Sequence, residues 1–173
     1  MKTRKNVKGF TLVELIVVIA IIGVLAAILV PSMLGYVKKS KLSSANSNAK
    51  NLFDAVNTTL VDMDSAGKTM KDLKGEGGKP LEMSYPTGLT TIGFDDAIKN
   101  YFSDISKTDK YGSAWVVQDM ACLACGMSDG TYTGSYPNPT TMEGDGAYDD
   151  LTSSKSSNVD KAKAVLAWAQ KGC

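Results

Sequence analysis

The chain has 173 residues, which suffices for one domain with an appendage but not for two ordinary domains. It contains no histidine, so it lacks the commonest general base and the commonest metal ligand. The formal net charge is +1, and four of the 19 basic residues stand in the first nine positions without an acid. The remaining chain has 15 basic and 18 acidic residues, a net charge of −3 that argues against a specific nucleic-acid partner. We expect neither an enzyme, nor a cofactor, nor a metal site.

A basic leader of nine residues precedes a long apolar segment. No charged or strongly polar residue occurs between Leu15 and Val30, and with its flanks this run has the roughly 20 residues of a bilayer span. The basic leader predicts a cytoplasmic N-terminus. A secretory signal fits poorly because its apolar core would be shorter. A plain membrane anchor is an alternative, but it leaves Glu14 unexplained, since a carboxylate at a bilayer centre costs about 2.5–3.5 kcal/mol.

The segment KGFTLVELIVVIAIIGVLAAILVP, residues 8–31, resembles the N-terminus of type IV prepilins, with their class III signal peptide, and of the related pseudopilins. This resemblance covers about the first 35 residues and suggests a major pilin of a Gram-positive-type system. It implies that a prepilin peptidase removes residues 1–9 by cutting after Gly9. It also implies that the new terminal nitrogen, on Phe10, is then methylated.

The spacing of Phe10 and Glu14 has a physical rationale. On a helix, positions i and i+4 are one turn apart, and the positive end of the helix dipole favours a carboxylate. The resemblance implies that Glu14 pairs with the Phe10 amine of a neighbouring subunit and so sets the register of assembly. It further implies that the helix between Gly23 and Pro31 loses order in a filament; a static kink at Pro31 is the alternative.

Helical signals continue beyond the apolar run. Apolar residues recur every three or four positions, which is typical of one helix face: Leu42, Ala45, Ala49, Leu52, Phe53, Val56, Leu60 and Met63. Gly67 is the expected stop. We therefore divide the mature chain into a membrane or filament-core helix at 10–34, its amphipathic continuation at 35–66, and a head domain at 67–173.

The head is expected to be a small α+β domain, an antiparallel sheet packed on the long helix, in agreement with the pilin fold that the resemblance implies. Strands are predicted over 81–85, 89–94, 113–119 and 130–136. Asp95 is expected to cap a short helix ending at Phe102. A loop at 137–150 should precede a helix at 157–170, which Ser157 and Asp160 begin as a capping box. A helical C-terminus departs from the usual pilin pattern.

The chain has three cysteines, Cys122, Cys125 and Cys173. Any single disulfide between two of them leaves the third as a free thiol. The resemblance favours a bridge from Cys173 to Cys122 or Cys125, outside the cell where thiols tend to pair. A bridge between Cys122 and Cys125 is the second possibility. A zinc site with an outside ligand is a third.

These observations lead to the hypothesis of a structural subunit, a major pilin that polymerises through its N-terminal helix into a helical surface filament. Its partners would be further copies of itself, the prepilin peptidase/methyltransferase, an assembly platform and cytoplasmic ATPases. The precursor would reside in the cytoplasmic membrane and the product in a cell-surface pilus serving adhesion, aggregation, biofilm formation and motility. A minor pilin, or a pseudopilin of type II secretion or DNA uptake, is the alternative.

Overall fold

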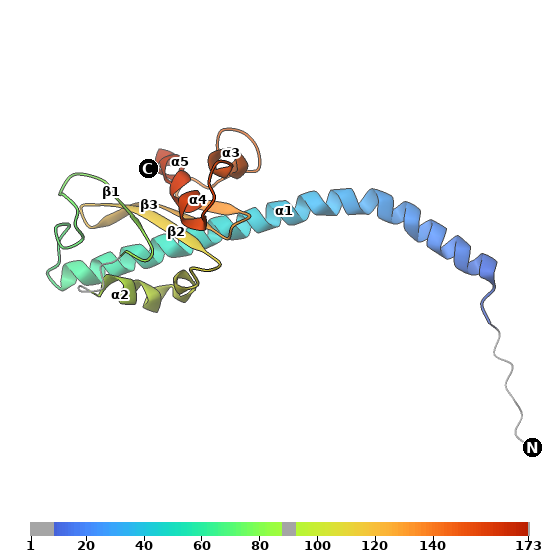
Figure 1. Ribbon diagram of the computed structural model, residues 1–173, viewed down its shortest axis with the longest axis horizontal. Coiled ribbons are helices and arrows are strands. Elements are labelled where there is room, and N and C mark those ends of the chain that lie inside the picture. Colours follow the sequence, from blue (N-terminus) through green and yellow to red (C-terminus); the bar gives the residue numbers. More distant parts are fainter. Residues whose placement is uncertain (1–8, 88–92, 173) are drawn as a thin grey trace, which may run out of the picture. The chain divides into compact units, whose positions relative to one another are not determined.

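The computed structural model describes residues 9–87 and 93–172 (Figure 1). The chain divides into two units, Met1–Lys38 and Lys39–Cys173, which are considered separately below. The first unit contains the beginning of one long helix. The second contains the rest of that helix, a four-stranded sheet and several short helices, and it is the α+β domain predicted from the sequence.

Helix α1 runs from Leu12 to Ser65 and passes through Pro31 without interruption. Within the first unit none of its side chains is buried. In the second unit the predicted apolar face is buried at Leu42, Ala45, Ala49, Leu52, Val56, Leu60 and Met63. Phe53, also predicted, is half-buried, and Ala55 and Thr59 are buried in addition. Gly67 ends the helix with φ +74°; Lys68 N–H donates to Met63 O and Gly67 N–H to Asp64 O, a Schellman motif that satisfies two terminal carbonyls.

The sheet is an antiparallel meander in the order β1-β2-β3-β4. Its strands are β1 (Leu81–Ser84), β2 (Gly112–Gln118), β3 (Ala121–Ser128) and β4 (Thr133–Tyr136). The first, second and fourth confirm predicted strands, with β4 shorter than expected, whereas β3 was not predicted. Asp119 and Met120 join β2 to β3 with φ of 49° and 60°, the positive values that a two-residue hairpin turn uses to match strand twist.

The two edge strands, β1 and β4, are only four residues long. A proline follows each of them closely, Pro86 after β1 and Pro137 after β4, and both prolines have cis peptide bonds. Because proline has no backbone N–H, neither position can supply a hydrogen-bond donor to a further strand.

Each face of the sheet is covered by helix. Trp115, Val117 and Met127 pack in one apolar core with the buried face of α1, to which Leu52 and Leu60 contribute. On the other face, Ala114 and Val116 pack against residues of α4 and α5. The backbone of α4 comes so close that a Cβ added at Gly112 would lie 2.0 Å from Asn158 C, and only glycine fits there.

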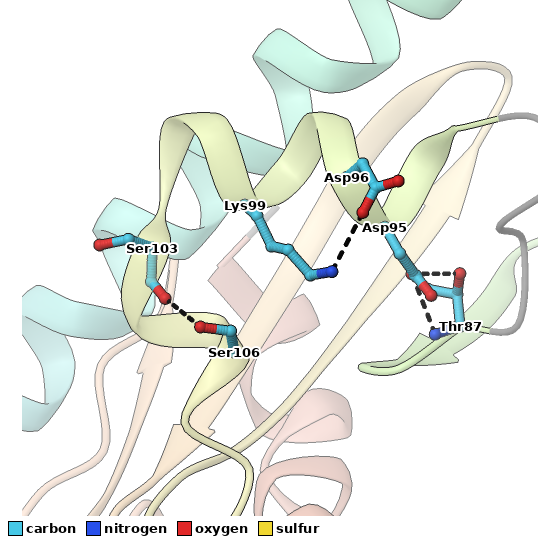
Figure 2. Close-up of polar contacts among 6 residues, drawn as sticks. All are labelled: Thr87, Asp95, Asp96, Lys99, Ser103 and Ser106. Carbon is cyan, nitrogen blue, oxygen red and sulfur yellow. Dashed lines mark hydrogen bonds and ion pairs between the residues drawn. The ribbon is translucent and has the colours of Figure 1, made fainter.

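Helix α2 (Phe94–Tyr101) and the 3-10 helix η2 (Ser103–Ser106) lie between β1 and β2 in the chain. The predicted strand at 89–94 falls mostly outside the described residues, and Phe94 begins α2 instead. Asp95 does not cap this helix: Gly93 is the N-cap, and Asp95 Oδ1 accepts hydrogen bonds from Thr87 N–H (3.1 Å) and Oγ1 (2.6 Å) (Figure 2). The buried carboxylate thereby ties the helix to the end of the preceding segment.

The C-terminal region is helical, as predicted, but in pieces. Helix α3 (Tyr148–Thr152) begins within the expected loop, and α4 (Asn158–Ala164), α5 (Leu166–Ala169) and η3 (Gln170–Gly172) follow. The N-cap half of the predicted capping box is confirmed, since Asp160 N–H donates to Ser157 Oγ at 3.0 Å. The Asp160 carboxylate accepts from the Ser157 hydroxyl, with Oγ and Oδ2 2.7 Å apart.

Candidate assembly site

The start of α1 is held by a second capping box, which the sequence analysis did not identify. Thr11 N–H donates to Glu14 Oε2 at 2.9 Å, and Thr11 Oγ1 donates to the same oxygen at 2.7 Å. In return Glu14 N–H donates to Thr11 Oγ1 at 3.3 Å. This reciprocal pattern requires a threonine and a glutamate three residues apart, so the pair Thr11–Glu14 was available as a signal.

Glu14 is the one charged residue of the segment 12–37, whose side chains are all exposed in the first unit. Both hydrogen bonds from Thr11 reach Oε2; among the described residues, no donor lies on Oε1. The capping box therefore orients the carboxylate while leaving one oxygen to accept a further partner. Gly9 and Phe10 precede the helix, and Phe10 is 84% exposed.

Gly23 and Pro31 both lie inside α1. Nothing lies within 4 Å of a Cβ added at Gly23, so this glycine serves no close contact within its unit. The described helix is continuous through both residues, and their loss of order in a filament stays a prediction.

In the second unit, two asparagines of α1 fix the sheet to the helix. Asn46 Oδ1 accepts from Ser135 N–H (3.0 Å), Thr140 N–H (3.1 Å) and Thr140 Oγ1 (3.0 Å), while its Nδ2 donates to Thr140 O (2.9 Å). Asn57 Oδ1 accepts from Cys122 N–H at 3.0 Å. The two residues are eleven positions apart, about three turns, so both face the sheet. The sequence analysis missed them because it followed only apolar spacing.

The structure brings Cys122 and Cys125 together on β3 as buried thiols, with their sulfurs 3.4 Å apart. Cys173 lies outside the described residues, so the predicted bridge to it stays a prediction. No cluster of three or more potential metal ligands occurs within residues 9–87 and 93–172.

Comparison with known proteins bears on the N-terminal segment. The family model described as "Prokaryotic N-terminal methylation motif" matches residues 4–30, which include Gly9, Phe10 and Glu14. The N-terminus of the chain thus carries a prokaryotic N-terminal methylation motif. The motif extends into α1, the one helix among the described residues that is long and apolar enough to cross a membrane.

The curated proteins to which the chain is similar include pilins and a protein of a type II secretion system. Type IV major fimbrial protein FimA of Dichelobacter nodosus is 41% identical over 78 residues, which are 42% of this chain and 49% of FimA. Type IV major pilin protein PilA of Myxococcus xanthus is 50% identical over 48 residues, 28% of this chain and 22% of PilA. Type II secretion system core protein G of Pectobacterium carotovorum is 33% identical over 87 residues, 50% of this chain and 56% of that protein.

The chain thus covers half or less of the length of these pilins. No solved structure matches it.

Proposed function

We propose that the chain is the precursor of a major type IV pilin, a structural subunit that polymerises through α1 into a surface filament. A prepilin peptidase cuts between Gly9 and Phe10 and the Phe10 nitrogen is methylated. The observation that carries this proposal is a single carboxylate, Glu14, one turn after the cleavage position in the otherwise uncharged and exposed apolar segment 12–37 of α1.

Cleavage creates the partner that Glu14 requires. In the precursor the Phe10 nitrogen is an uncharged amide, and after cleavage it is an ammonium group. Each charge is costly in hydrocarbon on its own, so a subunit gains by bringing its Glu14 to the ammonium of a neighbour. Because Thr11 occupies only Oε2, the approaching amine can meet Oε1 without breaking the capping box.

The chain occupies different places before and after assembly. The apolar segment 10–34 lies in the cytoplasmic membrane as long as the subunit is unassembled, and in the filament core afterwards. The head, residues 67–173, faces the outside. Such filaments serve adhesion, aggregation, biofilm formation and surface motility, driven by an assembly platform and ATPases that are separate proteins.

The experiment compares Glu14→Val with Ile16→Val, an uncharged change on the same helix. Both variants should reach the membrane fraction, detected with antibody to residues 68–173. Sheared filaments, counted by electron microscopy, should be lost only from Glu14→Val, and wild-type subunits should begin at methylated Phe10 by mass spectrometry. Normal filaments from Glu14→Val, or filament protein that begins at Met1, would refute the proposal.

A second candidate is a pseudopilin of a secretion or DNA-uptake system, which the similarity to the type II secretion core protein favours. The abundance of the protein in the sheared surface fraction distinguishes a major pilin from a pseudopilin. A major pilin is the dominant band of the sheared surface fraction, and its deletion removes the filaments. A pseudopilin is scarce there, and its deletion abolishes secretion or DNA uptake.

A further inference from the structure

Cys122 and Cys125 share a face of the sheet because of a local irregularity. Residues three apart on a regular strand point to opposite faces. In the β2–β3 ladder, however, Val116 pairs with Ala124 and Val117 with Cys122, so that Leu123 is an extra residue in β3. This bulge returns Cys122 to the α1 side, where it joins Cys125 in the apolar core.

The two thiols are in direct contact. Their sulfurs lie 3.4 Å apart, and Cys122 Sγ also donates to Ala124 O at 3.6 Å. Cys125 is completely buried, whereas Cys122 retains 6% exposure and lies two residues after Met120 of the β2–β3 turn. The backbone here is anchored, since Cys122 N–H donates to Asn57 Oδ1.

We propose that Cys122 and Cys125 form a dithiol pair, which is oxidised to a disulfide within β3 once the head is outside the cytoplasm. This inference rests on the proposed function, because that function places the head where oxidants are present. The oxidant is an exchangeable disulfide, either a small-molecule disulfide or that of an extracytoplasmic thiol oxidase.

The disulfide would form in two exchange steps, and the greater exposure of Cys122 determines which thiol reacts first. The Cys122 thiolate, having lost its proton to solvent, attacks the oxidant disulfide, forms a mixed disulfide and releases one thiolate. The Cys125 thiolate then attacks Cys122 Sγ, and the second thiolate leaves. The protein loses two protons and two electrons, and the two leaving thiolates take up two protons, so that the oxidant disulfide is reduced to two thiol groups. Burial, with the adjacent Cys122 sulfur, raises the pKa of the Cys125 thiol, consistent with its acting second.

The test uses the full-length chain, reduced in detergent and transferred to oxidised glutathione. After denaturation and alkylation, the reduced protein should carry three labels and the oxidised protein one, at Cys173, with a mass lower by two hydrogens before labelling. Cys173→Ser should form the same bond. Cys125→Ser should instead keep glutathione attached to Cys122.

Three outcomes overturn the inference: a wild-type bridge to Cys173, labelling of both Cys122 and Cys125 after oxidation, or loss of the bond in Cys173→Ser. The wild-type measurement decides even if the serine variants do not fold. Labelling of the sheared surface fraction separates this inference from the proposed function. Filaments with both thiols reduced would refute the disulfide alone, and a bond in purified protein of cells that lack filaments would refute the filament role alone.

Discussion

Replacing Asn46 by alanine should detach the segment after β4 from α1. The asparagine side chain makes four hydrogen bonds to Ser135 and Thr140, and alanine makes none. The Thr140 hydroxyl keeps a partner, because its single proton is shared between Asn46 Oδ1 at 3.0 Å and Thr133 O at the shorter distance of 2.6 Å. Two backbone N–H groups, those of Ser135 and Thr140, then lose their acceptor.

The size of the effect follows from the burial of these groups. Ser135 is 1% exposed and Thr140 is 3% exposed, so water cannot readily replace the lost acceptor. An unsatisfied buried donor costs about 1–3 kcal/mol, and two should lower the free energy of unfolding by about 2–6 kcal/mol. For a chain of this length the lower bound corresponds to a fall in Tm of at least about 4 °C.

Thermal unfolding of the full-length chain in detergent, followed by near-ultraviolet circular dichroism, measures this difference. Asn51→Ala is the matched control, since it makes the same chemical change on the exposed side of α1. The Tm of Asn57→Ala should lie between the Tm values of Asn46→Ala and Asn51→Ala, because Asn57 Oδ1 accepts one backbone N–H rather than two. Equal Tm values for Asn46→Ala and Asn51→Ala would show that these hydrogen bonds do not hold the sheet on the helix.

Two further predictions concern the head. A Cβ at Gly134 would lie 2.2 Å from the Ala45 backbone, so Gly134→Ala should lower the free energy of unfolding, measured in urea, by about 1–3 kcal/mol. Gly77→Ala is the control, because a Cβ there has nothing within 4 Å, and equal stabilities of the two variants would contradict the prediction. Burial, and after it the charge of Asp149, raises the pKa of Tyr148 to about 12. Because an unfolded tyrosine ionises near pH 10, the unfolded state loses its proton first, and stability should fall between about pH 10 and about pH 12. Tyr148→Phe should show a smaller fall in urea unfolding over that range, and an identical fall would exclude Tyr148 as its source.

The elements with strong periodicity were predictable from the sequence. Alternating or helical spacing gave α1, β2 and α4, and the chemistry of Gly67 and Ser157 gave a helix end and a helix start. Strand β3 was missed because its residues, ACLACGMS, include no β-branched or aromatic side chain. It is a strand through its pairing with β2 and its burial, which are tertiary effects.

Polar contacts were harder to predict than apolar ones. Asp95 stands where a capping residue is common, yet its carboxylate bonds to Thr87, eight positions earlier, and glycine takes the N-cap. Asn46 shows no local signal at all, since its partners lie about 90 residues further along the chain. Of the candidate assembly site, Phe10 and Glu14 were identified from the sequence, whereas Thr11 was not, although its spacing of three residues from Glu14 is the sequence signature of a capping box.

The short edge strands of the sheet limit how closely packed head domains can interact. An open strand edge is a template on which a neighbouring chain can add its own strand, and a high local concentration of chains favours this intermolecular pairing. Here each edge offers four residues before a proline ends the row of backbone donors. On the polymer that we propose, heads crowded side by side would therefore not join into continuous β-structure, and the contacts between subunits would be made by their helices.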